Sequence, residues 1–155
     1  KTTFSSAVRK ISADGGVAVY SELSIDTQSN NGSWYLGGPL GSAKWQTESK
    51  GTSAINAKTT SATYSSPVSN VVTFLADISA PNNVLRLNGT QVDQVTTTQG
   101  TGKLGNYPIF IGSRNNGSAY PWNGRTYGYV VRGANSTATE LSNLESWLNG
   151  VAKIY

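Results

Sequence analysis

The chain has 155 residues, of which 13% are charged, and it contains no cysteine, so a disulfide-stabilised scaffold is excluded. Its length predicts a single domain, residues 1–155, with a buried core. The net charge of +4 does not indicate nucleic-acid binding, because the basic residues are scattered along the chain, and no apolar run approaches the roughly 20 residues that span a membrane.

Strand signals alternate with turn signals through the first half of the chain. Turns are predicted at residues 13–16 (ADGG) and 29–32 (SNNG), and the polar stretch 50–63 fits either an edge strand or a long loop. The run NVVTFLADI is the most apolar of the predicted strands and is expected at the centre of a sheet. The predicted strands are residues 4–9, 17–26, 33–39, 44–47 and 70–78.

A hairpin and a strand–loop–strand unit follow. Residues 84–92 (VLRLNGTQV) form the hairpin, because Asn88 and Gly89 supply the two positive φ angles of a type I′ turn. Residues 96–106 are a loop, and residues 109–112 begin a strand. A second strand starts at Asn123, and its alternation predicts two faces: Arg125, Tyr127, Tyr129 and Val131 on one, and Thr126, Gly128, Val130 and Arg132 on the other.

One helix is predicted, near the C-terminus. Thr137 and Glu140 have the spacing of a capping box, in which the two side chains bond free backbone N–H groups of the first turn. Gly150 stands where a left-handed C-terminal cap is expected. The helix is predicted to pack by one apolar face formed by Leu141, Leu144 and Leu148, widened by Trp147 and Val151.

These elements predict an all-β sandwich or jelly roll closed by one short helix. The ordered set VLRLNGTQV, GNYPIFIGSRNNG, PWNGRTYGYVVRGANST and ELSNLESWLNG, preceded by AVRKISADGG, YSELS and NNGSWYL, resembles the LamG-like, concanavalin A-like lectin/glucanase sandwiches appended to bacteriophage tail and tail-fibre proteins. The resemblance implies two antiparallel sheets, one of them concave, with sugar or protein ligands at the concave face or the rim loops.

The chain departs from this pattern at its beginning. The family has a strand with an F-D-G-type turn before the segment matching TTFSSAVRK, and this chain shows no such segment. We therefore expect either a trimmed domain or a sheet edge completed by a neighbouring chain, since an open edge attracts pairing.

The acidic residues do not predict an enzyme. Related sandwiches include glycoside hydrolases with paired carboxylates, and the nearest pair here is Glu22 and Asp26. Four residues along a strand separate two side chains by about 13 Å, which is too far for either hydrolytic mechanism. The chain has no His and no Cys, which excludes catalytic triads and thiol chemistry.

No cofactor is expected. The one cluster that could be nominated for Ca²⁺ is Asp77 with Asn82 and Asn83. An Asn-rich turn is the favoured interpretation of these residues, because the D-x-D spacing of calcium loops is missing.

A sugar site needs flat aromatic surfaces and a few placed polar groups. The loop SRNNGSAYPW supplies the best candidates: Arg114, Asn115, Asn116, Tyr120 and Trp122. Tyr120 is the better stacking platform, since core packing is favoured for Trp122. A second patch holds Trp34 and Tyr35, one of which faces outward by strand alternation.

The resemblance implies an attachment function: a non-catalytic, glycan-recognising module of a phage tail or virion surface protein, extracellular or on the virion, that contacts host surface polysaccharide. A structural decoration or assembly module of a virion or other extracellular assembly is the alternative, with other subunits as partners. An accessory domain of a polysaccharide-degrading enzyme is the third. Tyr120 and Trp34 distinguish them, because sugar platforms are exposed in the free protein and assembly contacts are buried between chains.

Overall fold

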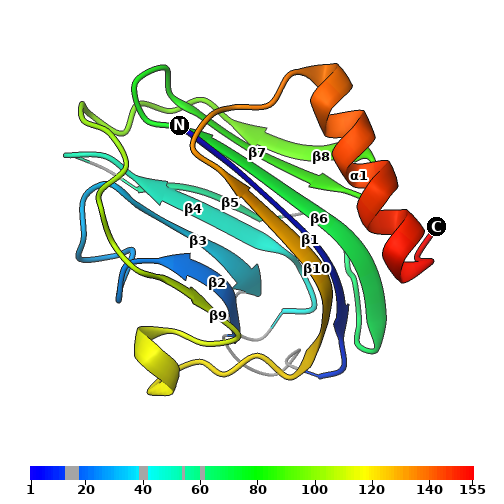
Figure 1. The fold of residues 1–155 in the computed structure, drawn as a ribbon. Helices are drawn as coiled ribbons and strands as arrows, with labels where there is room; N and C mark the ends of the chain where they lie inside the picture. Colours follow the sequence, from blue (N-terminus) through cyan, green and yellow to red (C-terminus); the bar gives the residue numbers. More distant parts are fainter. Residues whose placement is uncertain (13–17, 39–41, 54, 60–61) are drawn as a thin grey trace.

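The computed structural model describes residues 1–12, 18–38, 42–53, 55–59 and 62–155. Two antiparallel five-stranded sheets pack face to face, as the sequence predicts (Figure 1). The back sheet has the order β10-β1-β6-β7-β8 and the front sheet the order β5-β4-β3-β2-β9. The strands are β1 Thr2–Lys10, β2 Ala18–Leu23, β3 Ser33–Gly38, β4 Gln46–Lys50, β5 Ile55–Thr59, β6 Val68–Asp77, β7 Asn82–Leu87, β8 Thr90–Val95, β9 Ile109–Ile111 and β10 Gly124–Arg132.

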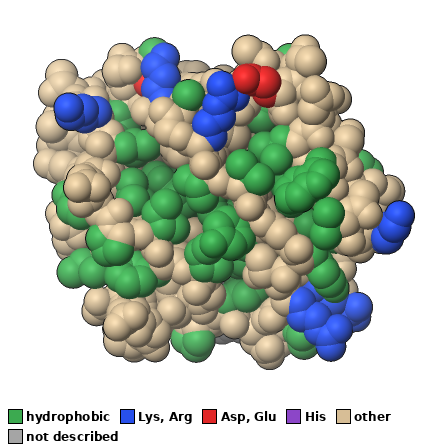
Figure 2. Space-filling view, viewed as in Figure 1, with side chains coloured by type: hydrophobic (Ala, Val, Ile, Leu, Met, Phe, Trp, Pro, Cys, Tyr) green, Lys and Arg blue, Asp and Glu red, His purple; other side chains and the backbone are tan. Residues whose placement is uncertain are grey.

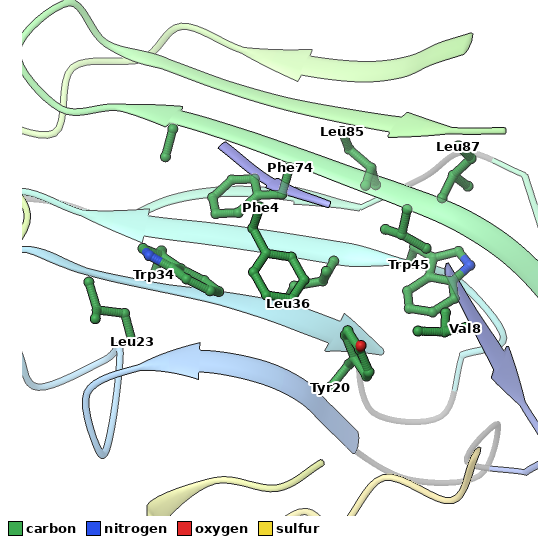
Figure 3. Packing of buried hydrophobic residues seen from close by; sticks show 12 residues of the cluster. Phe4, Val8, Tyr20, Leu23, Trp34, Leu36, Trp45, Phe74, Leu85 and Leu87 are labelled. Carbon is green, nitrogen blue, oxygen red and sulfur yellow. The ribbon is translucent and has the colours of Figure 1, made fainter. Parts of the chain in front are cut away.

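Aromatic side chains from both sheets fill the space between them (Figure 3). Phe4 of β1 lies 5.3 Å from Trp34 of β3, measured between ring centroids, and Trp34 lies 5.7 Å from Phe74 of β6. All three side chains are almost fully buried. Large aromatic groups remove much apolar surface from water, so burial of this cluster stabilises the sandwich.

Most of the strand predictions are confirmed. All but the last residue of the apolar run 70–78 lies in β6, the middle strand of the back sheet, and the predicted hairpin joins β7 to β8 with φ angles of 51° at Asn88 and 81° at Gly89. The ambiguous stretch 50–63 contains the edge strand β5. The predicted turn at 13–16 lies outside the described residues.

Two strand predictions were misplaced. The strand expected at 17–26 ends at Leu23, because the chain turns at Ser24, where φ is 93°. The strand expected at 44–47 instead covers Gln46–Lys50. Trp45 precedes it and is buried in the core, where its indole N–H donates to Asn70.

The predicted two faces of β10 are only half right. Its register with β1 shifts between Ala7 and Val8, which leaves Tyr127 as a bulged residue without a partner of its own. Val131 and Tyr129 pair with Phe4 and Ser6 and share one face, as the alternation predicts, and this face is turned toward the other sheet. Beyond the bulge the faces exchange, so that Arg125 pairs with Arg9 on the outer face.

The helix α1, Ala138–Ala152, begins with the predicted capping box. The Thr137 hydroxyl accepts from the Glu140 N–H at 3.3 Å, and the Glu140 carboxylate accepts from the Thr137 N–H at 2.8 Å. The predicted cap at Gly150 is wrong, because the helix continues one turn further and Lys153 adopts the left-handed conformation.

The helix packs on the outer face of the back sheet (Figure 1), through Leu141, Leu144 and Leu148 as predicted. The predicted widening of this face by Trp147 and Val151 is wrong, since both side chains are about half exposed. In the part of the chain that the structure describes, none of the helices combines the length and apolar character needed to cross a membrane. Because α1 packs on the back sheet, the outer face of the front sheet has no α-helix over it among the described residues.

Candidate ligand site on the front sheet

Three polar side chains form a row across the outer face of the front sheet. Trp34 and Leu36 point into the core, so Tyr35 between them points outward. Tyr35 pairs with Glu22 on β2 and with Glu48 on β4. Cross-strand partners share a face, and the row Glu22–Tyr35–Glu48 therefore lies on the outer side of the sheet.

Glu22 is the buried anchor of this row. Its Oε1 accepts from the N–H and the hydroxyl of Thr27, each at 2.7 Å, and its Oε2 contacts Arg114 Nε at 2.8 Å. Arg114 also reaches Asp26 Oδ1 through Nη1 at 3.4 Å. The Glu22 side chain is fully buried, and it thus holds the guanidinium of Arg114 in a fixed position.

The loop after β9 brings Arg114 to the sheet and places Tyr120 against it. The backbone N–H of Arg114 donates to Ala119 O at 2.9 Å, which closes the loop into a small hairpin. The carbonyl of Tyr120 accepts from the N–H of Val19 and ties the loop to the front sheet. The guanidinium carbon of Arg114 lies 5.0 Å from the centre of the Tyr120 ring, which is 41% exposed.

Glu48 extends the polar network to the far side of Tyr35. Its oxygens accept from the side-chain amides of Gln28 at 2.9 Å and Gln46 at 2.7 Å. Burial raises the pKa of the Glu48 carboxyl, and Arg114, which acts in the opposite direction, does not cancel the shift. Burial, followed by the charge of Glu48, also raises the pKa of Tyr35, which therefore keeps its phenolic proton.

We call this cluster the Arg114 site. It consists of Glu22, Asp26, Gln28, Tyr35, Glu48, Arg114 and Tyr120. It combines the exposed ring of Tyr120 and a partly exposed guanidinium with the row Glu22–Tyr35–Glu48, whose side chains are buried beneath the loop that carries Thr27 and Gln28. A guanidinium has five N–H groups, and its contacts with Glu22 and Asp26 leave donors for a ligand oxygen.

The structure brings together three of the seven residues predicted for sugar binding: Arg114, Tyr120 and Tyr35. Asn115 and Asn116 are exposed in the short 3₁₀ turn Asn115–Gly117 that directly follows Arg114.

The two predicted tryptophans face the interior. Trp34 is 1% exposed in the core, so its prediction as a ligand contact is wrong. Trp122 packs edge-on to Tyr20 at 5.3 Å and against Trp45 at 5.4 Å. It is therefore partly buried against the core, which agrees with the core packing favoured for it from the sequence.

Sequence reasoning missed Glu22, Asp26, Gln28 and Glu48 as members of the site. The estimate that Glu22 and Asp26 lie about 13 Å apart assumed one continuous strand. The turn at Ser24 breaks that strand and returns Asp26 to the guanidinium that Glu22 also contacts. One signal was present in the sequence: Trp34 and Leu36 are apolar at a spacing of two, which predicts that Tyr35 faces outward.

One acid of the site, Glu22, is committed to bonds within the fold. Both oxygens of Glu22 are bonded inside the protein, and its side chain has no exposed surface. Glu22 and Glu48 lie two strands apart, about 10 Å between backbones, with Tyr35 between them. The buried, doubly bonded Glu22 therefore serves to hold Arg114 in place.

The side-chain oxygens of the residues predicted as calcium ligands are bonded to other groups of the protein. Asp77 accepts from Ser79 and Ala80 and pairs with Lys1 at 2.9 Å, while Asn82 and Asn83 accept from Gln94 and Thr47. Burial raises the pKa of Asp77, but the bonds from Lys1, Ser79 and Ala80 outweigh it and lower the pKa to about 2. Among the described residues, no group of three or more acidic, His or Cys side chains is placed to hold a metal ion.

The sandwich is similar to solved lectin-type domains. It superposes on the CBM40 domain of the Ruminococcus gnavus IT-sialidase bound to α2,3 sialyllactose with a TM-score of 0.68, at 18% identity, over 93% of this chain and 81% of that one. The heptameric SAP-like pentraxin of Limulus polyphemus gives a TM-score of 0.67 at 9% identity, over 93% of this chain and 69% of that one.

Domains LG4–5 of the mouse laminin α1 chain give a TM-score of 0.63 at 11% identity, over 90% of this chain and 37% of that one. No protein-family model and no curated protein sequence matches the chain. The fold is a concanavalin A-like sandwich. The predicted fold class is therefore confirmed.

Proposed function

We propose that this domain recognises glycans and that the Arg114 site is its binding surface. The observation that supports this proposal most directly is the ion pair between the fully buried Glu22 and Arg114. This pair fixes Arg114 against the exposed ring of Tyr120, on a sheet face that no helix covers among the described residues. A fixed donor beside a flat aromatic ring matches the two needs of a sugar: bonds to its oxygens and contact with its apolar C–H face.

The similar structures support this proposal. The CBM40 domain has been solved with α2,3 and with α2,6 sialyllactose bound. Sialylated oligosaccharides are therefore the first ligands to test, with Arg114 as the donor to a sugar carboxylate. A neutral glycan is the competing choice, because Glu22, Asp26 and Glu48 surround Arg114 with acidic groups.

For its biological setting we propose attachment: a non-catalytic module on a phage tail or other virion surface that binds host surface polysaccharide. This setting rests on the sequence resemblance to tail-fibre sandwiches. Tyr120 is exposed in the single chain, as a sugar platform requires, and a subunit contact would be exposed in the single chain as well. An assembly module and an accessory domain of a polysaccharide-degrading enzyme are the alternatives.

The test is binding to a panel of sialylated oligosaccharides and bacterial and algal polysaccharides, measured for the wild type and two variants. Tyr120→Ala removes the platform, and Tyr127→Ala removes a tyrosine of nearly equal exposure, 39% against 41%, on β10. Burial of an aromatic side chain contributes about 1.5–3 kcal/mol, so Tyr120→Ala is expected to weaken binding at least about tenfold. Tyr127→Ala should bind as the wild type does.

Equal weakening by both variants would place the sugar elsewhere on the surface. Absence of binding to the whole panel by a folded sample would favour the assembly module.

A further inference from the structure

The sandwich is open along one side. Val131 and Tyr129 of β10 face the space between the sheets, since their partners on β1 are the core residue Phe4 and Ser6, whose hydroxyl bonds the buried Tyr20. Ile109 and Ile111 of β9 face it from the other sheet, opposite Leu23 and Ser21. These four inward-facing side chains, Ile109, Ile111, Tyr129 and Val131, are nevertheless 37–52% exposed, and we call them the open seam.

Figure 2 shows apolar side chains gathered across the centre of this face of the molecule. Most core positions of a sandwich are covered by the opposite sheet, but β9 has only three residues and leaves much of β10 uncovered. Contiguous apolar surface that is exposed in one chain is typical of an interaction surface.

The edge of β10 beside the seam is free to form a ladder. β10 is the last strand of the back sheet and pairs only with β1 among the described strands. Its segment Gly128–Arg132 has regular register, whereas the bulge at Tyr127 exchanges the faces of the residues before it. A bulge disrupts edge pairing, so a docked strand can follow β10 only along these five residues, about 17 Å.

We propose that a second copy of this chain pairs with this edge, antiparallel, with the two β10 strands related by a twofold axis at Val130. In this register Tyr129 of each copy lies opposite Val131 of the other on the seam side. An aromatic residue opposite a β-branched residue is a stabilising cross-strand pair. The two back sheets become one continuous sheet, and the two open seams lie side by side.

On the outer face of the same register, Gly128 lies opposite Arg132. Leu148 and Trp147 of α1 already lie over Gly128, and Arg132 pairs with Glu140 of its own chain at 2.6 Å, so the seam side carries the contact. The like-charged neighbours Arg9 and Arg125 lie beyond the bulge and outside the shared ladder. A twofold contact of this kind closes on itself, which predicts a dimer and not a fibre. The proposal is independent of glycan binding, because the Arg114 site lies on the front sheet.

The first test is sedimentation velocity of the wild type over a wide range of concentration, since self-association follows mass action. The wild type should change from monomer to dimer as the concentration rises. Val131→Lys places a charge in the seam and should remain monomeric. Val151→Lys makes the same change at an exposed site on α1 and should dimerise as the wild type does.

The second test locates the axis. The chain has no cysteine, so Val130→Cys introduces a single thiol at the proposed axis. Residues opposite one another in an antiparallel ladder have Cα atoms about 4.5–5.5 Å apart, within the range that a disulfide spans. Mild oxidation should cross-link Val130→Cys rapidly and Val151→Cys slowly.

A wild type that stays monomeric at its solubility limit overturns the proposal. So does a dimer that survives Val131→Lys and cross-links no faster through position 130 than through position 151. Unchanged circular dichroism of each variant will show that loss of the dimer is not loss of the fold.

Discussion

Two buried glutamate–arginine pairs lie on opposite sides of the sandwich and serve different ends. Glu145 of α1 contacts Arg86 of β7 through both carboxylate oxygens, at 2.8 and 2.9 Å. Glu22 of β2 contacts Arg114 at 2.8 Å through one oxygen. Burial is similar: the glutamate side chains are 3% and 0% exposed and the arginines 19% and 16%.

The two arginines differ in which of their N–H donors are bonded within the fold. Arg86 donates through Nε and through both N–H groups of Nη2, to Glu145 and to Gly89 O, so three of its five N–H groups are used within the fold. Arg114 makes only a longer contact, 3.4 Å, with its second acid, and its flat face lies against an exposed tyrosine. The first pair attaches a helix, and the second presents a donor at the surface.

Removal of the glutamates should give the largest effects. Breaking a buried ion pair costs about 3–5 kcal/mol, because the remaining charge is left unpaired. Glu22→Ala should cost more than Glu145→Ala, since it also removes two acceptor bonds to Thr27, worth about 1 kcal/mol each. Urea unfolding of both variants measures this difference. The reverse order would show that the loop bearing Arg114 rearranges to recover its partner.

Replacement of the arginines should separate the two roles. Lysine keeps the charge and loses the planar fork, so Arg86→Lys and Arg114→Lys should both reduce the free energy of unfolding modestly. Only Arg114→Lys should weaken glycan binding, by about tenfold for the loss of roughly 1.4 kcal/mol. Titration calorimetry with a glycan bound by the wild type measures this. Equal affinity losses would contradict the division of roles.

Local chemistry explains what the sequence predicted correctly. The type I′ turn at Asn88–Gly89 and the capping box at Thr137 depend on residues that are neighbours in the chain, and both are present. The row on the front sheet depends on strand pairing: Glu22, Tyr35 and Glu48 become neighbours only when three strands align. Single-strand distances therefore could not reveal it.

The wrong predictions share a physical cause. The face of Arg125 depends on the bulge at Tyr127, which the alternation of side chains does not encode. Trp147 is predicted to widen the apolar face because it lies beside the leucine stripe, yet the helix meets the sheet along Leu141, Leu144 and Leu148 and leaves Trp147 half exposed. Tertiary packing decides such positions, and residue type alone does not.

The smallest predicted effect is a pH dependence within the Arg114 site. Burial raises the pKa of Glu48 in the folded chain above its ordinary value of 4.5. The folded state then holds this proton more tightly than the unfolded state, so Glu48 lowers the free energy of unfolding as the pH rises from 4.5 through the raised pKa. Glu48→Gln cannot ionise and lacks this loss. The difference in free energy of unfolding, variant minus wild type, should therefore increase between pH 4.5 and the raised pKa of Glu48 and remain constant at higher pH.

Glu140 provides a control of opposite sign. Its hydrogen bonds from Arg132 and Thr137 lower its pKa from 4.5 to about 2, so its stabilising contribution is present above pH 4.5 and is lost as the pH falls through about 2. Glu140→Gln should thus differ from the wild type most above pH 4.5 and least in strong acid. Urea midpoints of both variants, measured against pH, test the two signs together. A Glu48→Gln profile that runs parallel to the wild type throughout would mean that Glu48 is as well solvated in the folded chain as in the unfolded one. The row Glu22–Tyr35–Glu48 would then be open to water at Glu48, and Arg114 would lose the dry surroundings that strengthen its bonds to a ligand.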